Sequence, residues 1–276
     1  MDWGQQVKRI SVELVPREEE ALREELSLLK KFEDKVDVIN IPDLLRLEMR
    51  SWEGAAVAGE YFPAVMPHIR AMDIDLDAEL PMKDYLRTHG IKEVLVIEGD
   101  PPQDMKHATF PTESTDVIWK FGHEMPEVKV YAGIDQYRSS MKQEQYRIKR
   151  KLQAGAAGFF TQPFFDMRLL DMYYEMLDGT EVYWGVSPVM TQASKNYWER
   201  KNNVVFPKDF SYNLQASVAF AKEVMAYAEK HEASLYFMPI KTNLKAYIEG
   251  IFAWFRWSRE QSLAEGIDFL NKDSIS

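Results

Sequence analysis

The chain has 276 residues, of which 46% are hydrophobic and 28% are charged, and its formal net charge is -10. This composition predicts a soluble globular protein with a substantial core, and the acidic balance argues against a broad basic surface for nucleic acid or an anionic membrane. Because the chain has no cysteine, disulfides and thiolate metal sites are excluded.

The N-terminal residues Met1–Gln6 lack the basic and then apolar pattern of a signal peptide, and no window approaches about 18 uninterrupted apolar residues. We therefore expect a cytoplasmic protein without a membrane anchor. The length suits one α/β barrel, so a single domain is predicted over residues 1–276. The sequence leaves the oligomeric state open, a homo-oligomer included.

Short apolar runs alternate with longer amphipathic stretches, which is typical of βα units around a parallel sheet. The predicted strands are Arg9–Leu14, Val36–Ile41, Ala64–Ile69, Glu93–Glu98, Val128–Ile134, Gly158–Gln162, Glu181–Val186 and Ser234–Met238. Amphipathic helices are predicted at Glu18–Phe32, Gln143–Ala154, Leu169–Leu177 and Leu214–His231. The predicted fold class is therefore α/β, a single (β/α)8 TIM barrel.

Polar residues at the ends of the predicted strands are the first candidates for chemistry, because in such a barrel these ends meet at one mouth. Glu13 lies among apolar neighbours, where a carboxylate is costly without a partner or a task. Glu98, Gly99 and Asp100 end the fourth strand, although Asp100 before a proline also suits a turn. Gln162 ends the sixth strand.

Aromatic residues and a possible helix cap, Asp166, follow Gln162. The basic run Arg147–Lys151 is more often a solvated helix face than a phosphate site. No H-E-x-x-H, G-x-S-x-G or G-x-G-x-x-G motif is present, so metallohydrolase, serine hydrolase and Rossmann-type dinucleotide sites have no support, and no metal site is predicted.

Five segments, taken in order, resemble those of the methylenetetrahydrofolate reductase family. The family motifs S-F-E-F-F-P, G-D-x-P, K-x-K-x-x-A-G-A, T-Q-x-F-F-D and G-I-x-P-V are matched by Ser11–Pro16, Gly99–Pro102, Lys149–Ala156, Thr161–Asp166 and Gly185–Val189. The match extends over nearly the whole chain and keeps the family's order.

This resemblance implies reduction of 5,10-methylenetetrahydrofolate to 5-methyltetrahydrofolate, with NADH or NADPH as donor and FAD as cofactor. By the same resemblance Glu13 is the general acid and Asp100 lies near the pterin and the flavin. Gln162 hydrogen-bonds the folate, while Phe164 and Phe165 supply an apolar wall. The residues around the flavin and its phosphates are His68, Gly99, Tyr131, Arg150 and Lys151.

Three departures fall mainly on the flavin side. The family often has R-G-D where this chain has Glu98, and a carboxylate near a pyrophosphate repels it, so Glu98 must turn away or pair with Arg150 or Lys151. The T-Y-G-A and T-L-N segments are replaced by Asn40–Asp43 and Pro239–Lys241. Flavin-free hydride transfer from NAD(P)H to the same folate therefore stays an alternative, as do a folate-linked methyltransferase and a folate-binding barrel.

Overall fold

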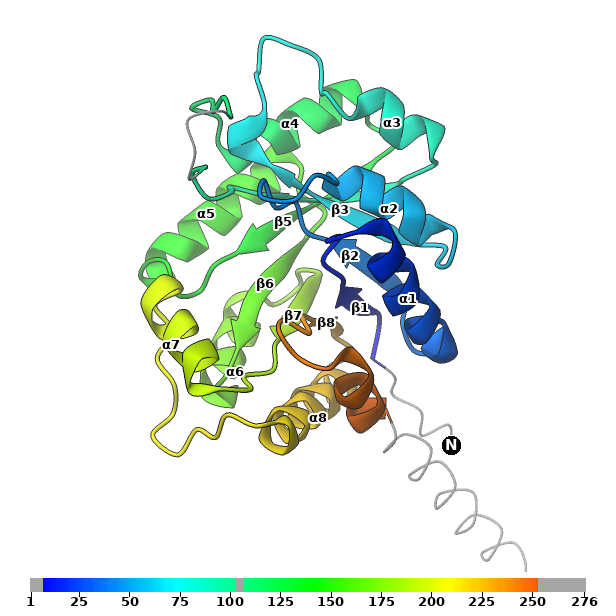
Figure 1. The fold of residues 1–276 in the computed structure, drawn as a ribbon. Helices are drawn as coiled ribbons and strands as arrows, with labels where there is room; N and C mark the ends of the chain where they lie inside the picture. The colour runs from blue at the N-terminus through cyan, green and yellow to red at the C-terminus, as the bar shows by residue number, and fades with distance from the viewer. Residues whose placement is uncertain (1–6, 103–106, 253–276) are drawn as a thin grey trace, which may run out of the picture.

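The structure is a computed structural model that describes residues 7–102 and 107–252 (Figure 1). Eight parallel strands pair in chain order, and β8 pairs with β1, so that the sheet closes on itself. Helices surround the strands on the outside (Figure 1). The predicted (β/α)8 TIM barrel is confirmed. Residues 1–6 and 253–276, which belong to the predicted domain, lie outside the described residues.

All eight predicted strands are confirmed, and their ends differ from the prediction by two residues at most. The strands are β1 Ile10–Glu13, β2 Val38–Ile41, β3 Val65–Arg70, β4 Glu93–Ile97, β5 Lys129–Ile134, β6 Gly158–Phe164, β7 Val182–Val186 and β8 Ser234–Phe237. Each is a short apolar run because a barrel strand is covered on both faces.

The helices are α1 Glu19–Leu29, α2 Ser51–Gly59, α3 Lys83–Thr88, α4 Ser114–Glu124, α5 Met141–Ala154, α6 Met167–Met176, α7 Gln192–Lys201 and α8 Leu214–Lys230. Short 3-10 turns occupy Lys30–Phe32 and Ala71–Asp73, and residues 244–252 are helical. The four predicted helices are confirmed as α1, α5, α6 and α8. In the described part of the chain, no helix has the length and apolar character needed to cross a membrane.

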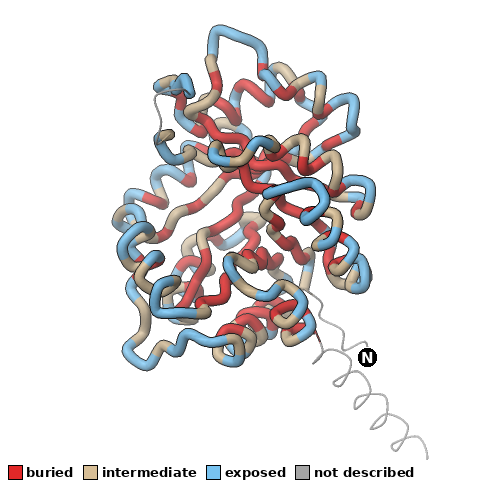
Figure 2. Tube along the Cα trace, in the orientation of Figure 1, coloured by how far each residue is buried: buried red, intermediate tan, exposed pale blue. Residues whose placement is uncertain are grey.

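Alternation along each strand separates two cores, because successive side chains point to opposite faces. Outward residues such as Val12, Val96 and Trp184 pack against the helices. Inward residues fill the barrel, and they are Val38, Met66, Leu95, Tyr131, Phe160, Tyr183, Tyr236 and Met238. Figure 2 shows the buried residues concentrated along the strands.

Charged pairs close the end of the barrel at which the strands begin. Both terminal nitrogens of Arg9 donate to Glu93, each at 2.9 Å. Lys129 and the Tyr131 hydroxyl donate to Glu181 at 3.1 and 2.9 Å. Matched partners make these partly buried charges tolerable, so these charged groups are already satisfied within the protein.

The contact between β6 and β7 contains a register shift between Phe160 and Pro163. Such a bulge redirects the side chain beside it, and Gln162 lies within it. The strands approach closely here because Gly185 has no side chain: its N–H donates to Thr161 Oγ1 at 2.8 Å. An added Cβ at Gly185 would lie 2.6 Å from the Thr161 carbonyl oxygen.

We therefore expect Gly185→Ala to lower the free energy of unfolding by about 1–3 kcal/mol, because the strands must move apart to admit the methyl group. Urea denaturation measures this change. Gly122 on α4 is the matched control, since an added Cβ there meets nothing within 4 Å; Gly122→Ala should stabilise by about 0.5–1 kcal/mol. A Gly185→Ala protein as stable as wild type would contradict the close packing of β6 on β7.

Candidate functional site

A cavity of about 950 Å³ lies at the end of the barrel where the strands finish. Its walls come from the ends of β3, β4 and β5, from Gln162 in β6, and from the segments after β2, β4 and β5. The start of α4, one side of α5 and the end of α7 complete them. This is where a barrel places its active site, and the volume is at the upper end of the range for small-molecule sites. In the described part of the chain, no three His, Asp or Glu side chains gather as metal ligands.

Glu13 ends β1 with its side chain turned into the barrel, and 11% of that side chain is exposed. The Tyr236 hydroxyl on the neighbouring β8 donates a hydrogen bond to Oε2. Burial raises the pKa of Glu13 to about 7, and the bond from Tyr236 opposes part of this rise. A carboxyl with this pKa gives or accepts a proton near neutral pH.

His68 lies beside Glu13, with 4.0 Å between Nε2 and the carboxylate Oε2. Burial lowers the pKa of His68 to about 3, so the imidazole is neutral near pH 7. The Asn40 amide nitrogen donates to Ser11 Oγ, which leaves its oxygen to face His68 Nε2 at 3.2 Å. That orientation assigns the imidazole proton to Nε2, and Glu13 receives no compensating positive charge from His68.

The loop after β4 contacts the end of β3. Gly99 has a φ of 87°, which favours glycine, and the Arg70 guanidinium lies against it. Arg70 Nη2 donates to the main-chain oxygen of Asp100 at 2.6 Å, while the Asp100 side chain lines the cavity. Glu98 turns toward the start of α4 and accepts bonds from the N–H and hydroxyl of Ser114, so it pairs with neither predicted cation.

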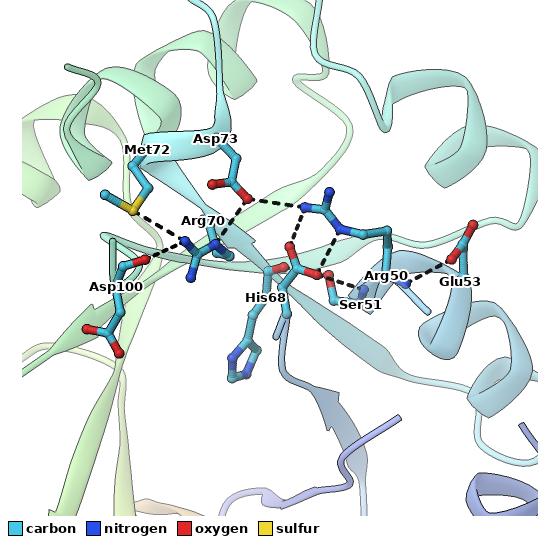
Figure 3. A network of polar contacts seen from close by, with 9 residues as sticks. Arg50, Ser51, Glu53, His68, Arg70, Met72, Asp73 and Asp100 are labelled. Atoms are coloured by element: carbon cyan, nitrogen blue, oxygen red, sulfur yellow. Dashed lines mark hydrogen bonds and ion pairs between the residues drawn. The ribbon is translucent and has the colours of Figure 1, made fainter. Parts of the chain in front are cut away.

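A network of arginine and aspartate side chains surrounds Arg70 (Figure 3). Arg50 donates to both oxygens of the buried Asp43 at 3.0 and 2.6 Å. Asp73 Oδ2 accepts from Arg70 Nε at 3.0 Å and from Arg50 Nη2 at 3.3 Å. Arg50, Arg70 and Asp73 were not among the predicted site residues. Arg70 follows the predicted strand Ala64–Ile69 directly, which was a usable signal, whereas Arg50 lies far from the end of a predicted strand, just before α2.

Gln162 lines the cavity as predicted from the end of the sixth strand. Its main-chain oxygen accepts from Gln136 Nε2 at 2.7 Å, which holds the bulge in place. Among the described residues, nothing forms a hydrogen bond with the Gln162 side-chain amide. This amide therefore keeps its donors and acceptor for a ligand.

Three residues of the basic run on α5 have partners within the protein. Arg147 pairs with Glu144 at 3.2 Å, and Arg150 pairs with Glu113 at 2.9 Å. Lys151 is buried and donates to the Gly133 main-chain oxygen at 2.6 Å, and burial lowers its pKa. Arg150 and Lys151 do line the cavity, but each already has a partner, Glu113 and the Gly133 main-chain oxygen.

Two predicted site residues lie away from the mouth. Tyr131 is fully buried inside the barrel, and its hydroxyl points to Glu181 at the closed end, so it is not in the position that the resemblance implied for a flavin contact. Phe164 points outward and packs against Tyr173 and Trp184, so it cannot form a wall of the cavity. Tyr131 points into the barrel but lies too far from the mouth, whereas the pleat turns Phe164 to the outer face of the sheet.

Phe165 takes a different place from Phe164. It packs with Val189, Trp198 and Val204 in a separate cluster beneath α7, next to the mouth. Asp166 begins α6, where its side chain accepts from the Arg168 N–H at 2.9 Å, so the predicted cap is confirmed.

Solved structures with the same fold cover most of this chain. An uncharacterized protein from Clostridium thermocellum, which binds two copies of 5-methyl-5,6,7,8-tetrahydrofolic acid, superposes with a TM-score of 0.61 at 13% identity, over 90% of this chain and 94% of that chain. Oxaloacetate acetylhydrolase superposes with a TM-score of 0.54 at 10% identity, over 95% and 84%. At these identities the likeness extends to the fold alone.

Sequence comparison is more specific about the family. No curated protein matches the chain. The family model described as Methylenetetrahydrofolate reductase matches residues 63–234, which is more than half of the 276 residues. The matched region contains Asp100 and Gln162, whereas Glu13 precedes it. On this match, the chain belongs to the methylenetetrahydrofolate reductase family.

Proposed function

We propose that the protein reduces 5,10-methylenetetrahydrofolate to 5-methyltetrahydrofolate, with NADH or NADPH as the hydride donor. The observation that carries this proposal is Glu13, a carboxyl at the mouth end of the barrel whose pKa is raised to about 7. Opening the methylene bridge requires a proton donor that stays protonated near neutral pH, and a desolvated carboxyl supplies one.

In the proposed reaction Glu13 gives its proton to the bridging nitrogen, the carbon–nitrogen bond breaks, and the methylene carbon becomes an iminium. Hydride from the reduced nicotinamide then adds to that carbon, which becomes the methyl group, and Glu13 is reprotonated from water. The Tyr236 hydroxyl, which donates to Glu13 Oε2, stabilises the carboxylate left after the proton transfer. Because His68 is neutral, it supplies no positive charge that would lower the pKa of Glu13.

Asp100 and Gln162 are the proposed folate contacts, since both line the cavity. A reduced pterin presents ring N–H groups, an amino group and a carbonyl, which suit a carboxylate and a side-chain amide. The unpartnered Gln162 amide supports this role, because a buried or half-buried amide without a partner is costly until a ligand satisfies it.

The described residues do not fit FAD well. Seven basic residues line the cavity, but so do six acidic ones, Asp43, Glu98, Asp100, Glu113, Asp135 and Glu144. Arg150 and Lys151 are bound to partners, and Tyr131 lies at the closed end. A pyrophosphate would meet carboxylates where the resemblance implied free cations. We therefore propose that hydride passes directly from the nicotinamide to the folate.

A folate-binding barrel without catalysis is the second candidate, because a solved structure of the same fold binds 5-methyl-5,6,7,8-tetrahydrofolic acid. A binding protein has no need of a proton donor with a raised pKa, and perturbed groups of this kind concentrate at catalytic sites. Glu13 therefore favours the reductase over the binding protein.

Glu13→Gln should reduce the rate of folate reduction by roughly 100-fold or more, because the amide keeps the shape but has no acidic proton. In the wild type, kcat/KM for the folate should be level below pH about 7 and fall above it, since Glu13 loses its proton as the pH rises through its pKa. Stopped-flow NADH oxidation across pH measures both, with NADH affinity as the control for folding. A near wild-type rate in the variant would refute the assignment of Glu13.

Gln162→Ala should weaken folate binding by about 1–3 kcal/mol and leave NADH binding unchanged, because only the folate uses the side-chain amide. Titration calorimetry with 5-methyltetrahydrofolate and NADH measures the two affinities. Gln153→Ala, on the exposed face of α5, is the matched control and should change neither. Equal losses for both ligands would instead indicate that Gln162 supports the mouth as a whole.

The purified protein should stay colourless after incubation with FAD and dialysis, and it should still oxidise NADH with methylenetetrahydrofolate. Glu98→Arg should be equally colourless, because the new cation leaves the other carboxylates of the cavity in place and also removes the partner of Ser114. Visible absorbance gives the bound flavin directly. Stoichiometric FAD retained by the wild type would overturn direct transfer and restore the flavin route.

A further inference from the structure

Arg70 is a charged residue at the end of β3 whose exposed fraction is only 6%, and it lines the cavity. Nε is bonded to Asp73, and Nη2 is bonded to the main-chain oxygen of Asp100 and to Met72 Sδ. Nη1 forms no hydrogen bond with any of the described residues. Figure 3 shows this third nitrogen directed into the space between the Asp100 carboxylate and the His68 ring.

The guanidinium is held rigidly. Asp73 is shared with Arg50, which itself is anchored by the buried Asp43. On the other side, Gly99 lets the loop after β4 come so close that an added Cβ would lie 3.1 Å from Arg70 Cζ and 3.3 Å from Nη1. A donor fixed in this way loses little conformational freedom when a ligand binds.

The charges around Arg70 favour an uncharged acceptor over an anion. Asp73 already balances Arg70, and Asp43 balances Arg50, so the network has no surplus positive charge. The carboxylate of Asp100 lines the same cavity and would repel a phosphate or carboxylate placed against Nη1. A carbonyl oxygen next to an N–H group is the better match, since Nη1 donates and Asp100 accepts.

We propose that Arg70 determines specificity for the pterin, with Nη1 donating to the ring carbonyl oxygen while the Asp100 carboxylate accepts from the neighbouring ring N–H. This inference rests on the proposed function, in which the folate occupies the cavity. The carboxamide of a nicotinamide offers the same pair of groups, so the experiment measures both ligands.

The test compares affinities for 5-methyltetrahydrofolate and for its 4-amino counterpart, in which an amino group replaces the ring carbonyl. Wild type should prefer the carbonyl compound by roughly 10- to 100-fold, the range for hydrogen bonds to a charged group. Arg70→Met should lose most of this preference by weakening the carbonyl compound alone, with NADH affinity unchanged. A smaller preference should remain, because the 4-amino compound also lacks the ring N–H that Asp100 accepts. Arg70→Lys, which keeps the charge beside Asp73, should lose most of the preference as well and covers a failure of the Met variant to fold.

Arg50→Lys is the matched control, because Arg50 shares the same carboxylate but does not line the cavity. It should keep the wild-type preference. An Arg70 variant that keeps the full preference, or that loses NADH affinity instead, would overturn this inference and leave the proposed function intact. Failure of the wild type to bind either folate would overturn the proposed function and this inference with it.

Discussion

The pairing of β8 with β1 closes the barrel and also creates the surroundings that shift the pKa of Glu13. It brings Tyr236 to Glu13 across 223 positions of the chain, so that the hydroxyl donates to the carboxylate. Closure removes most water from Glu13, and this desolvation dominates the shift in its pKa. The opposing bond from Tyr236 limits the shift, which leaves the carboxyl balanced near neutrality instead of permanently protonated.

Several charged side chains at the mouth are paired with one another. Arg50 and Arg70 meet Asp43 and Asp73, and the basic side of α5 meets acidic residues or main-chain oxygens. Such matching makes buried cations tolerable but weakens their attraction for a phosphate. The directional hydrogen-bond donors and acceptors that remain support the proposed binding of an amide-rich heterocycle.

The two kinds of group in the site are complementary. Glu13 and the neutral His68 lie deep between β1, β2 and β3, in surroundings that control one proton. The cavity is lined by Asp100, Gln162 and Arg70, whose groups can orient a ligand, and not by Glu13 or His68. In the proposed reaction the cavity residues orient the folate and Glu13 supplies the proton, so recognition and proton transfer use different side chains.

Sequence by itself determined where the strands lie and which of their ends are polar, because apolar alternation and helix periodicity are local properties. It therefore predicted the barrel and the mouth positions of Glu13, Asp100 and Gln162. Only the tertiary structure decided which way each side chain points and what it meets. Tyr131 lies too deep in the barrel to reach the mouth, and Phe164 points to the outer face of the sheet. The Arg70 guanidinium is positioned by contacts with Asp73, Gly99 and Asp100. Such contacts depend on register and closure, which no local pattern encodes.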